Sequence, residues 1–416
     1  MLKYKIVNEG KGFLLFIIVI LSTLSFYNPY GIISKEISKL IFYISFTVCL
    51  IYALKNGINI QKLKYPSKSF KLLIVGILIS TLMPFLYHNQ PFIQTLISSL
   101  PYIFSYLFFY VLMKLNISKH KILKAIFIFS FIGMFIYLVN LITFPNILFG
   151  EPKDNFDLSR GIVRLSIPSF LFTLLLYFYS INNYILYKKK KYLFLILLTL
   201  IFILLSVTRQ VILLALILGT IMLMKNFSFI KKISVLVIII CVYWIVLPRI
   251  PIYNEMVELS KNQIERNKYD KEDIRITAWK FYTYDFQANT ITAFCGNGIP
   301  SLGKSAWGHK FEKTVSLDYG GNGCYYVDVG WAGFYWLFGL FSTIGLASIL
   351  IKAILKKKSI HERYLSYWCA LIFLTSFTSG SILFYQQIIS ITTILYLIYG
   401  KKRNDSYNNS ELQQLQ

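Results

Sequence analysis

The feature that most constrains this chain is a succession of long apolar runs, most of them bounded by lysine or arginine. A membrane-spanning helix needs roughly 20 apolar residues, and these runs divide into about twelve such segments. A chain that is 56% hydrophobic and 17% aromatic is also too apolar for a soluble globular protein. We therefore predict an all-α polytopic integral membrane protein with about twelve transmembrane helices.

One long polar interval interrupts the apolar runs and sets the predicted organisation. We expect spans one to nine in residues 1–248, an extracytoplasmic loop with short helices in 249–328, spans ten to twelve in 329–400 and a disordered tail in 401–416. The first run, Phe13 to Tyr27, ends in Asn28-Pro29 with no small-residue cleavage site. It is therefore expected to remain as the first span.

The net charge of +25 is unevenly distributed along the chain. After the basic N-terminus, basic clusters recur at Lys55 to Lys71, Lys114 to Lys124, Lys188 to Lys191, Lys225 to Lys232, Lys352 to Arg363 and Lys401 to Arg403. Each gap follows an even number of predicted spans, so the positive-inside rule places both termini in the cytoplasm and the large loop in the periplasm or outside the cell. The charge therefore indicates the cytoplasmic (inner) membrane rather than nucleic acid as the partner.

The apolar stretch between Lys191 and Lys225 predicts a helical hairpin. Both ends are basic, and a single helix of this length would measure about 50 Å against a bilayer core of about 30 Å. Splitting it at Ser206 to Gln210 gives two arms of about 16 residues, each about 24 Å long. Arg209 then lies below the outer surface, which indicates either a functional cavity for an anion or a structural ion pair.

Two further arginines open the predicted sixth span. Arg160 and Arg164 are four residues apart, which places them on one face of a helix, and Arg164 lies within the apolar run. Arginine inside hydrocarbon usually faces a cavity or a partner charge. Alternatively, both side chains extend to the outer headgroups.

The polar loop begins near Arg249 and carries a periodic set of larger side chains. Arg275, Trp279, Tyr282 and Phe286 have the spacing of one helical face. Aromatic rings suit sugar rings and a guanidinium suits phosphate oxygens, so this face is a candidate substrate-binding surface. The same pattern also fits an amphipathic helix lying on the membrane.

Residues Gly298 to Ser305 fit the nucleotide-binding pattern GxxxxGK[ST]. That motif requires a preceding core strand and a following helix, so that backbone amides converge on phosphates. Here Pro300 removes one amide, the residues after Ser305 do not read as a helix, and the segment is predicted to lie outside the cytoplasm. We therefore expect no nucleotide, and a glycine-rich turn that allows backbone to approach a ligand or a neighbouring helix.

The candidate acids and bases of the loop are His309, Asp318 and Asp328. Asp328 is expected at the outer end of the tenth span, where capping of the helix would equally explain it. Glycines at positions 330, 333, 339 and 345 follow, and they would allow close helix packing.

The residues that usually hold metals or form catalytic triads are not arranged in known patterns. The five cysteines include no CxxC pair, and HExxH, GxSxG and kinase signatures do not occur. We therefore predict no metal and no cofactor. Cys295 and Cys324 both fall in the outer loop, where they are either bridged or two unrelated thiols.

Several segments together resemble the superfamily of O-antigen polymerases (Wzy-type) and O-antigen ligases. The resemblance rests on the span count, the large outer loop before the third-last span and four motifs in order: TRQ ending at Gln210, IRITAW ending at Trp279, GNGIP ending at Pro300 and DVGWAGFYWLFG beginning at Asp328. It implies a GT-C-like fold and a metal-independent inverting glycosyltransferase.

The family resemblance also implies a substrate and roles for residues. A growing glycan would pass from undecaprenyl diphosphate to a lipid-linked repeat unit, as in O-antigen or capsule polysaccharide synthesis. Arg209 and Arg275 would bind the diphosphate with help from Arg160 and Arg164. Asp328 is the first candidate for the base that deprotonates the acceptor hydroxyl, followed by His309 and Asp318. A further protein that sets chain length is an implied partner.

Two departures from the family pattern leave alternatives open. Ligases carry a His-Asn pair just before the corresponding span, whereas this chain has Gly320-Gly-Asn-Gly-Cys324. The RX15G repeats of some polymerases do not occur at these arginines. The alternatives are an O-antigen ligase and, from another class, a flippase or transporter of lipid-linked oligosaccharide.

Overall fold

The computed structural model describes residues 2–23, 34–58, 65–149, 156–157, 164–165, 169–206, 208–225, 249, 254, 258, 261 and 273–400. Within these ranges the protein is helical apart from one antiparallel pair of two-residue strands, β1 (Phe156–Asp157) and β2 (Arg164–Leu165). Six of the described helices are long and apolar enough to cross a membrane. This confirms the prediction of an all-α membrane protein.

The described helices fall into two groups along the chain, before and after residues 226–272. The first group is α1 (Leu2–Thr23), α2 (Lys35–Asn56), α3 (Ser67–Tyr87), α4 (Phe92–Leu115), α5 (Lys119–Thr143), α7 (Phe170–Tyr187), α8 (Lys190–Leu205) and α9 (Arg209–Met224). The second group is α12 (Ile274–Lys280), α13 (Thr290–Cys295), α14 (Ala306–Val315), α15 (Gly330–Leu355), α16 (Tyr364–Thr375) and α17 (Tyr385–Tyr399). Short turns of other helix types are η5 (Phe281–Asp285), η6 (Leu317–Tyr319), η7 (Tyr326–Asp328) and η8 (Ile360–Glu362).

The six spanning candidates are α2, α3, α4, α5, α7 and α15. Helices α8, α9, α16 and α17 have 16, 16, 12 and 15 residues and are too short to be counted with them. The predicted ninth span, Ile233 to Leu247, lies outside the described residues. The count of about twelve spans therefore stays a prediction.

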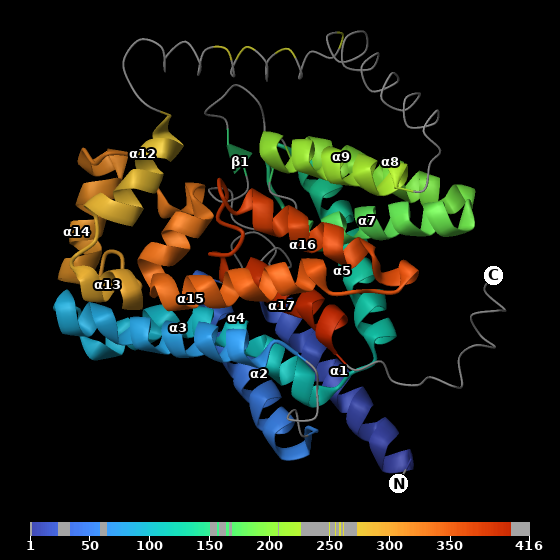
Figure 1. Ribbon diagram of the computed structural model, residues 1–416, viewed down its shortest axis with the longest axis horizontal. Helices are drawn as coiled ribbons and strands as arrows, with labels where there is room; N and C mark the ends of the chain where they lie inside the picture. Colours follow the sequence, from blue (N-terminus) through green and yellow to red (C-terminus); the bar gives the residue numbers. More distant parts are fainter. Residues whose placement is uncertain are drawn as a thin grey trace.

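The helix ends that carry basic residues lie together. The amide of Ile58, just after α2, donates to the carbonyl of Lys114 at the end of α4 over 2.9 Å. Lys352, in the last turn of α15, donates to Ser69 in the first turn of α3 over 2.8 Å. We call this the basic end; Figure 1 shows α12, α13 and α14 at the opposite end, which we call the loop end.

The predicted hairpin between Lys191 and Lys225 is confirmed. Helices α8 and α9 have 16 residues each and meet at Ser206 to Thr208, as the length argument requires. Both pack against α7.

The prediction of a helical face shared by Arg160 and Arg164 is wrong at Arg164. The backbone of Arg164 belongs to strand β2, where it is paired with Asp157, and helix α7 begins only at Phe170. Pro168 disfavours helical backbone at Ile167, so a helix is not expected to run unbroken from Arg164 into α7. Arg160 lies outside the described residues.

Helices α3 and α15 pack closely and antiparallel through small residues. A side chain at Gly76 of α3 would collide with Ser342, and one at Gly345 of α15 would lie 2.7 Å from the backbone nitrogen of Leu73. The hydroxyl of Ser80 donates to the carbonyl of Leu337 over 2.7 Å. The prediction that glycines of this span allow close helix packing is confirmed.

Helix α15 is interrupted at Gly339, whose φ of 76° and ψ of 176° are not helical. The segment that follows α13 fills the break: the amide of Asn297 donates to the carbonyl of Trp336 over 2.8 Å, and that of Gly298 to Leu337 over 2.9 Å. The carbonyls that lose their helical partners at the interruption therefore accept hydrogen bonds from this segment instead. Such replacement is required where water is excluded.

Candidate functional site

The turn between α16 and α17, residues Ser376–Phe384, receives contacts from two distant segments. At the start of α9, Gln210 donates to the carbonyl of Leu374 over 3.4 Å and accepts a hydrogen bond from the hydroxyl of Thr378. From α12, the indole of Trp279 donates to the carbonyl of Phe377 over 2.9 Å, and the two rings stack with centroids 6.0 Å apart. We call this segment the junction turn.

The start of α15 also packs on the junction turn. The amide of Trp331 donates to the carbonyl of Ser376 over 2.8 Å, and its indole donates to Phe373 over 3.0 Å. Val329 occupies the position before the helix, so Asp328 lies one residue further out and is exposed. A side chain at Gly330 would collide with the carbonyl of Ser379, so the two segments are in close contact.

The described arginines differ in their relation to this turn. Arg209 is the half-buried first residue of α9, next to Gln210. Arg275 is exposed in the first turn of α12, one turn before Trp279, and its amide is capped by Asp273 over 2.8 Å. Arg249 is exposed. The side chain of Arg164 and all of Arg160 lie outside the description, so gathering of all five guanidinium groups stays a prediction.

The predicted aromatic face is wrong at Tyr282. Its ring is fully buried, and its hydroxyl donates to the carbonyl of Cys324 over 2.6 Å. Phe286 stacks on Trp336 of α15, with ring centroids 5.3 Å apart and planes at 10°. The helix widens into the π-turn η5 after Lys280, so these rings turn into the protein. Of the three aromatic residues of the predicted face, Trp279 and Phe286 are half-buried and Tyr282 is buried.

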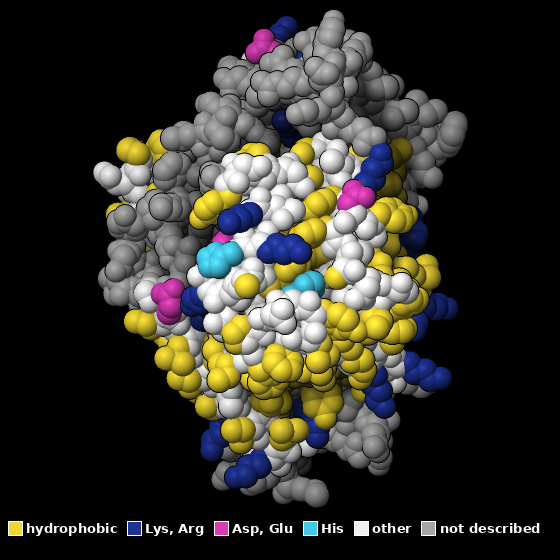
Figure 2. Space-filling model, turned by 90° about the vertical axis from the view of Figure 1, so that its left-hand side faces the viewer, with side chains coloured by type: hydrophobic (Ala, Val, Ile, Leu, Met, Phe, Trp, Pro, Cys, Tyr) yellow, Lys and Arg dark blue, Asp and Glu magenta, His cyan; other side chains and the backbone are white. Residues whose placement is uncertain are grey.

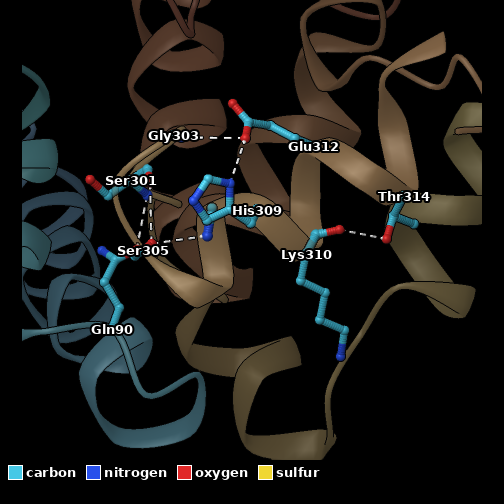
Figure 3. A network of polar contacts seen from close by, with 9 residues as sticks. Gln90, Ser301, Gly303, Ser305, His309, Lys310, Glu312 and Thr314 are labelled. Atoms are coloured by element: carbon cyan, nitrogen blue, oxygen red, sulfur yellow. Dashed lines mark hydrogen bonds and ion pairs between the residues drawn. The ribbon is translucent and has the colours of Figure 1, made fainter. Parts of the chain in front are cut away.

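His309 lies on the surface of α14, where its Nδ1 is 3.5 Å from a carboxylate oxygen of Glu312 (Figure 3). Glu312 also accepts a hydrogen bond from the amide of Gly303 over 3.3 Å. The contact of His309 is therefore with Glu312 of its own helix, which binds the loop before α14, and not with the junction turn. The side chain of Asp318 lies outside the description.

The segment that matched the nucleotide pattern is held by Gln90, a fully buried residue between α3 and α4. Its side-chain oxygen accepts from the amide of Ser301 and the hydroxyl of Ser305, both over 2.9 Å, and its nitrogen donates to Ile299 over 3.2 Å (Figure 3). The expectation that no helix follows was wrong, since α14 begins at Ala306. The amides of Ser301 and Gly303 nevertheless serve protein acceptors rather than converging on an open site.

Gly298 explains part of the glycine-rich pattern. Its φ is 70°, and a side chain there would collide with Pro84 of α3. The expected approach of backbone to a neighbouring helix is confirmed. Beside it, His88 stacks on Trp307 with centroids 3.6 Å apart, and burial lowers the pKa of His88 to about 4.

The surface of the loop end is polar over its centre. In Figure 2, which looks onto this end, polar side chains with lysine, arginine and histidine gather over the described part and apolar side chains border them. Cys295 and Cys324 are both free thiols. Among the described residues, no group of three or more histidine, cysteine, aspartate or glutamate side chains is placed to hold a metal ion.

Sequence reasoning missed the polar residues that join these segments. Gln90 and the half-buried Gln210 stand at the boundaries of apolar runs, and an amide at such a position is the signal that could have found them; the buried Asn297 lies within the polar loop and carries no such signal. The chain matches no protein-family model and no curated protein. Its function has to be argued from its own residues.

Proposed function

We propose that this protein is a polysaccharide repeat-unit polymerase of the cytoplasmic membrane, with its loop end facing outward. It transfers a growing glycan from a lipid diphosphate, undecaprenyl diphosphate in the related systems, to a lipid-linked repeat unit. Both termini are then cytoplasmic. The proposal starts from the resemblance to O-antigen polymerases and is supported by one spatial relation.

That relation is the meeting of the segments that carry the resemblance. Gln210 of TRQ, Trp279 of IRITAW and Trp331 of DVGWAG all donate hydrogen bonds to carbonyls of residues 374–377. The fourth segment, GNGIP, hydrogen-bonds to α15 through Asn297 and Gly298. These donors also satisfy backbone carbonyls of interrupted helices, and the proposal takes the meeting of these segments as the shared site that a transferase needs.

The chemistry follows from the residue types around the junction turn. An acceptor hydroxyl oxygen attacks the anomeric carbon, the bond from that carbon to the diphosphate breaks, and the configuration inverts. The hydroxyl proton passes to a carboxylate base, and Asp328 is proposed for this role because it directly precedes the segment of α15 that contacts the turn. Arg209 and Arg275 stabilise the charge of the departing diphosphate, a role that elsewhere falls to a metal ion.

Asp328 is preferred over the two other candidate bases on position. His309 is bound to Glu312 on the outer surface of α14, away from the junction turn. Asp318 lies in η6, beyond α14 in the chain. Asp328 is the last residue of η7, two residues before Gly330, which lies against the carbonyl of Ser379.

The test uses purified protein in proteoliposomes with a lipid-linked repeat unit as substrate. A ladder of longer glycans is expected, and Arg209→Ala, Arg275→Ala and Asp328→Asn should each lower the rate about 10²- to 10³-fold, as loss of one electrostatic group commonly does. The matched control is Lys313→Ala, which removes an exposed cation of α14 and should leave the rate unchanged.

The alternatives predict different products in the same assay. A flippase leaves glycan length unchanged and alters the sidedness of the lipid. A ligase moves the glycan onto a different acceptor lipid. Full polymerisation by both arginine variants would refute the diphosphate assignment. A protein that regulates chain length would change the distribution of glycan lengths in the ladder, but the ladder would form without it.

A further inference from the structure

A cavity of about 280 Å³ lies at the basic end, far from the proposed active site. It is formed where α5 begins and where α15 and α17 end, together with η8. The polar residues that line it are Lys119, Lys356, Lys357, Lys358, Ser359 and Glu362. Four lysines and one glutamate thus line the cavity, so its lining carries an excess of positive charge.

Two of these lysines are fixed in place by the ends of helices. Lys356 donates to the carbonyl of Ile398 over 2.8 Å and lies 4.6 Å from the centroid of the Tyr399 ring. Lys358 donates to the hydroxyl of Ser366 over 2.6 Å and to the carbonyl of Ala353. Because an ammonium has three N–H donors, Lys356 retains donor capacity after its one carbonyl contact.

The charge of the cavity is partly desolvated. Burial lowers the pKa of both Lys356 and Lys358, and the nearby carboxylate of Glu362 acts in the opposite direction on each. An anion that entered the cavity would replace the water that these ammonium groups have lost, and would favour the protonated, charged form of both lysines. The first residue of α5 is Lys119, so the positive end of that helix dipole points to the same place.

We propose that this cavity binds a phosphate group, and that its source is the headgroup of an anionic phospholipid. We infer a phosphate group as the ligand because ammonium donors cluster at the cavity and a hydroxyl donor, that of Ser359, lies at its edge. The lipid source follows from position, because the cavity lies at the ends of the membrane-crossing helices α5 and α15, which is the level of the headgroups. Free inorganic phosphate would use the same donors.

The experiment places the full chain in nanodiscs, which expose both leaflets. Thermal unfolding is followed in discs of neutral phosphatidylcholine and in discs that also contain phosphatidylglycerol or cardiolipin. The third arm adds millimolar inorganic phosphate to the neutral discs. Variants are Lys119→Gln and Lys357→Gln, and the control is Lys124→Gln, an exposed lysine of α5 that does not line the cavity.

The expected result is a rise in melting temperature with anionic lipid that is reduced in the two cavity variants and kept in the control. Lipid affinity, measured by titration of anionic lipid, should fall about fivefold for each lysine removed, the equivalent of about 1 kcal/mol. The stabilisation should also weaken with rising salt, because exposed ionic contacts are screened.

Three other outcomes would overturn the inference in part or in full. Equal stabilisation by inorganic phosphate in neutral discs would keep the phosphate site and refute the lipid source. No response in any arm would refute the site. An equal loss in Lys124→Gln would show general surface charge rather than this cavity. None of these outcomes bears on polymerase activity, since the cavity and the junction turn lie at opposite ends.

Discussion

Replacing Gly339 by alanine tests the interrupted helix α15 most directly. The φ of 76° with ψ of 176° is a backbone conformation that only glycine adopts readily. An added Cβ would lie 2.5 Å from the backbone nitrogen of Gly296 and would also collide with the carbonyl of Phe294. The segment after α13 would therefore have to withdraw from the break.

The cost can be estimated from these two effects. Holding a residue with a side chain in such a conformation costs roughly 1–3 kcal/mol. Withdrawal of the segment endangers the hydrogen bonds from Asn297 to Trp336 and from Gly298 to Leu337, each worth about 1 kcal/mol net. We expect Gly339→Ala to lower the free energy of unfolding by roughly 3–5 kcal/mol.

The chain offers a matched control in Gly303, which also has positive φ, 63°, but has no atom within 4 Å of an added Cβ. Gly303→Ala should cost only the backbone term, roughly 1–2 kcal/mol. Both variants are titrated with sodium dodecyl sulfate in mixed micelles, and unfolding is followed by tryptophan fluorescence. If the two midpoints coincide, the inserted segment does not support α15 and the reasoning is refuted.

Three further outcomes follow from the loop end and from the charge distribution. Gln90→Leu should lower the free energy of unfolding by roughly 2–4 kcal/mol in the same titration, because the buried amide of Ser301 and the carbonyl of Ile299 lose their hydrogen-bond partner. A smaller loss than that of Gly303→Ala would contradict this. The folded pKa of His88, about 4, lies below its ordinary value of 6.5, so its contribution to stability is present above pH 6.5 and is lost as pH falls toward 4. His88→Gln should flatten that part of the pH profile, and an unchanged slope would exclude His88 as its source. With Cys295 and Cys324 replaced by serine, a membrane-impermeant maleimide applied to intact cells should label Lys313→Cys and not Lys357→Cys, and the reverse pattern would invert the proposed topology.

The regular parts of the fold could be predicted because they depend on length and on charge. The hairpin of α8 and α9 followed from comparing the length of one apolar run with the thickness of a bilayer. The shared location of the basic helix ends followed from their alternation along the chain. Neither inference needed knowledge of which side chains touch, and both agree with the described residues.

The irregular parts could not be predicted because tertiary contacts decide them. Helix α14 contains Gly308 and begins after a glycine-rich loop, so propensity argued against it. It forms because Ser305 caps its first turn and because Trp307 and Phe311 are buried against the protein. Similarly, the face of α12 could not be followed past Lys280, since the π-turn η5 changes the helical period.

The candidate site was predicted as a set of residue types, and its geometry depends on residues that carry no motif. Arginine and aspartate at apolar boundaries stand out because burying a charge is costly. Gln210 and the carbonyl of Phe377 do not stand out, yet they hold α9 and α12 on one turn. A sequence pattern can therefore identify the groups that would react, while the contacts that bring them together remain hidden until the chain is folded.

The two interruptions of regular structure at the loop end have one physical consequence. The break at Gly339 and the junction turn both interrupt helical hydrogen bonding in apolar helices, where an unsatisfied carbonyl is costly. Donors from Asn297, Gly298, Trp279 and Trp331 satisfy them. Each of these donors lies in a segment on which the proposed function rests. The pairing that stabilises the interrupted helices thus also fixes the positions of the residues proposed to act on the glycan, so a variant that weakens one should displace the other.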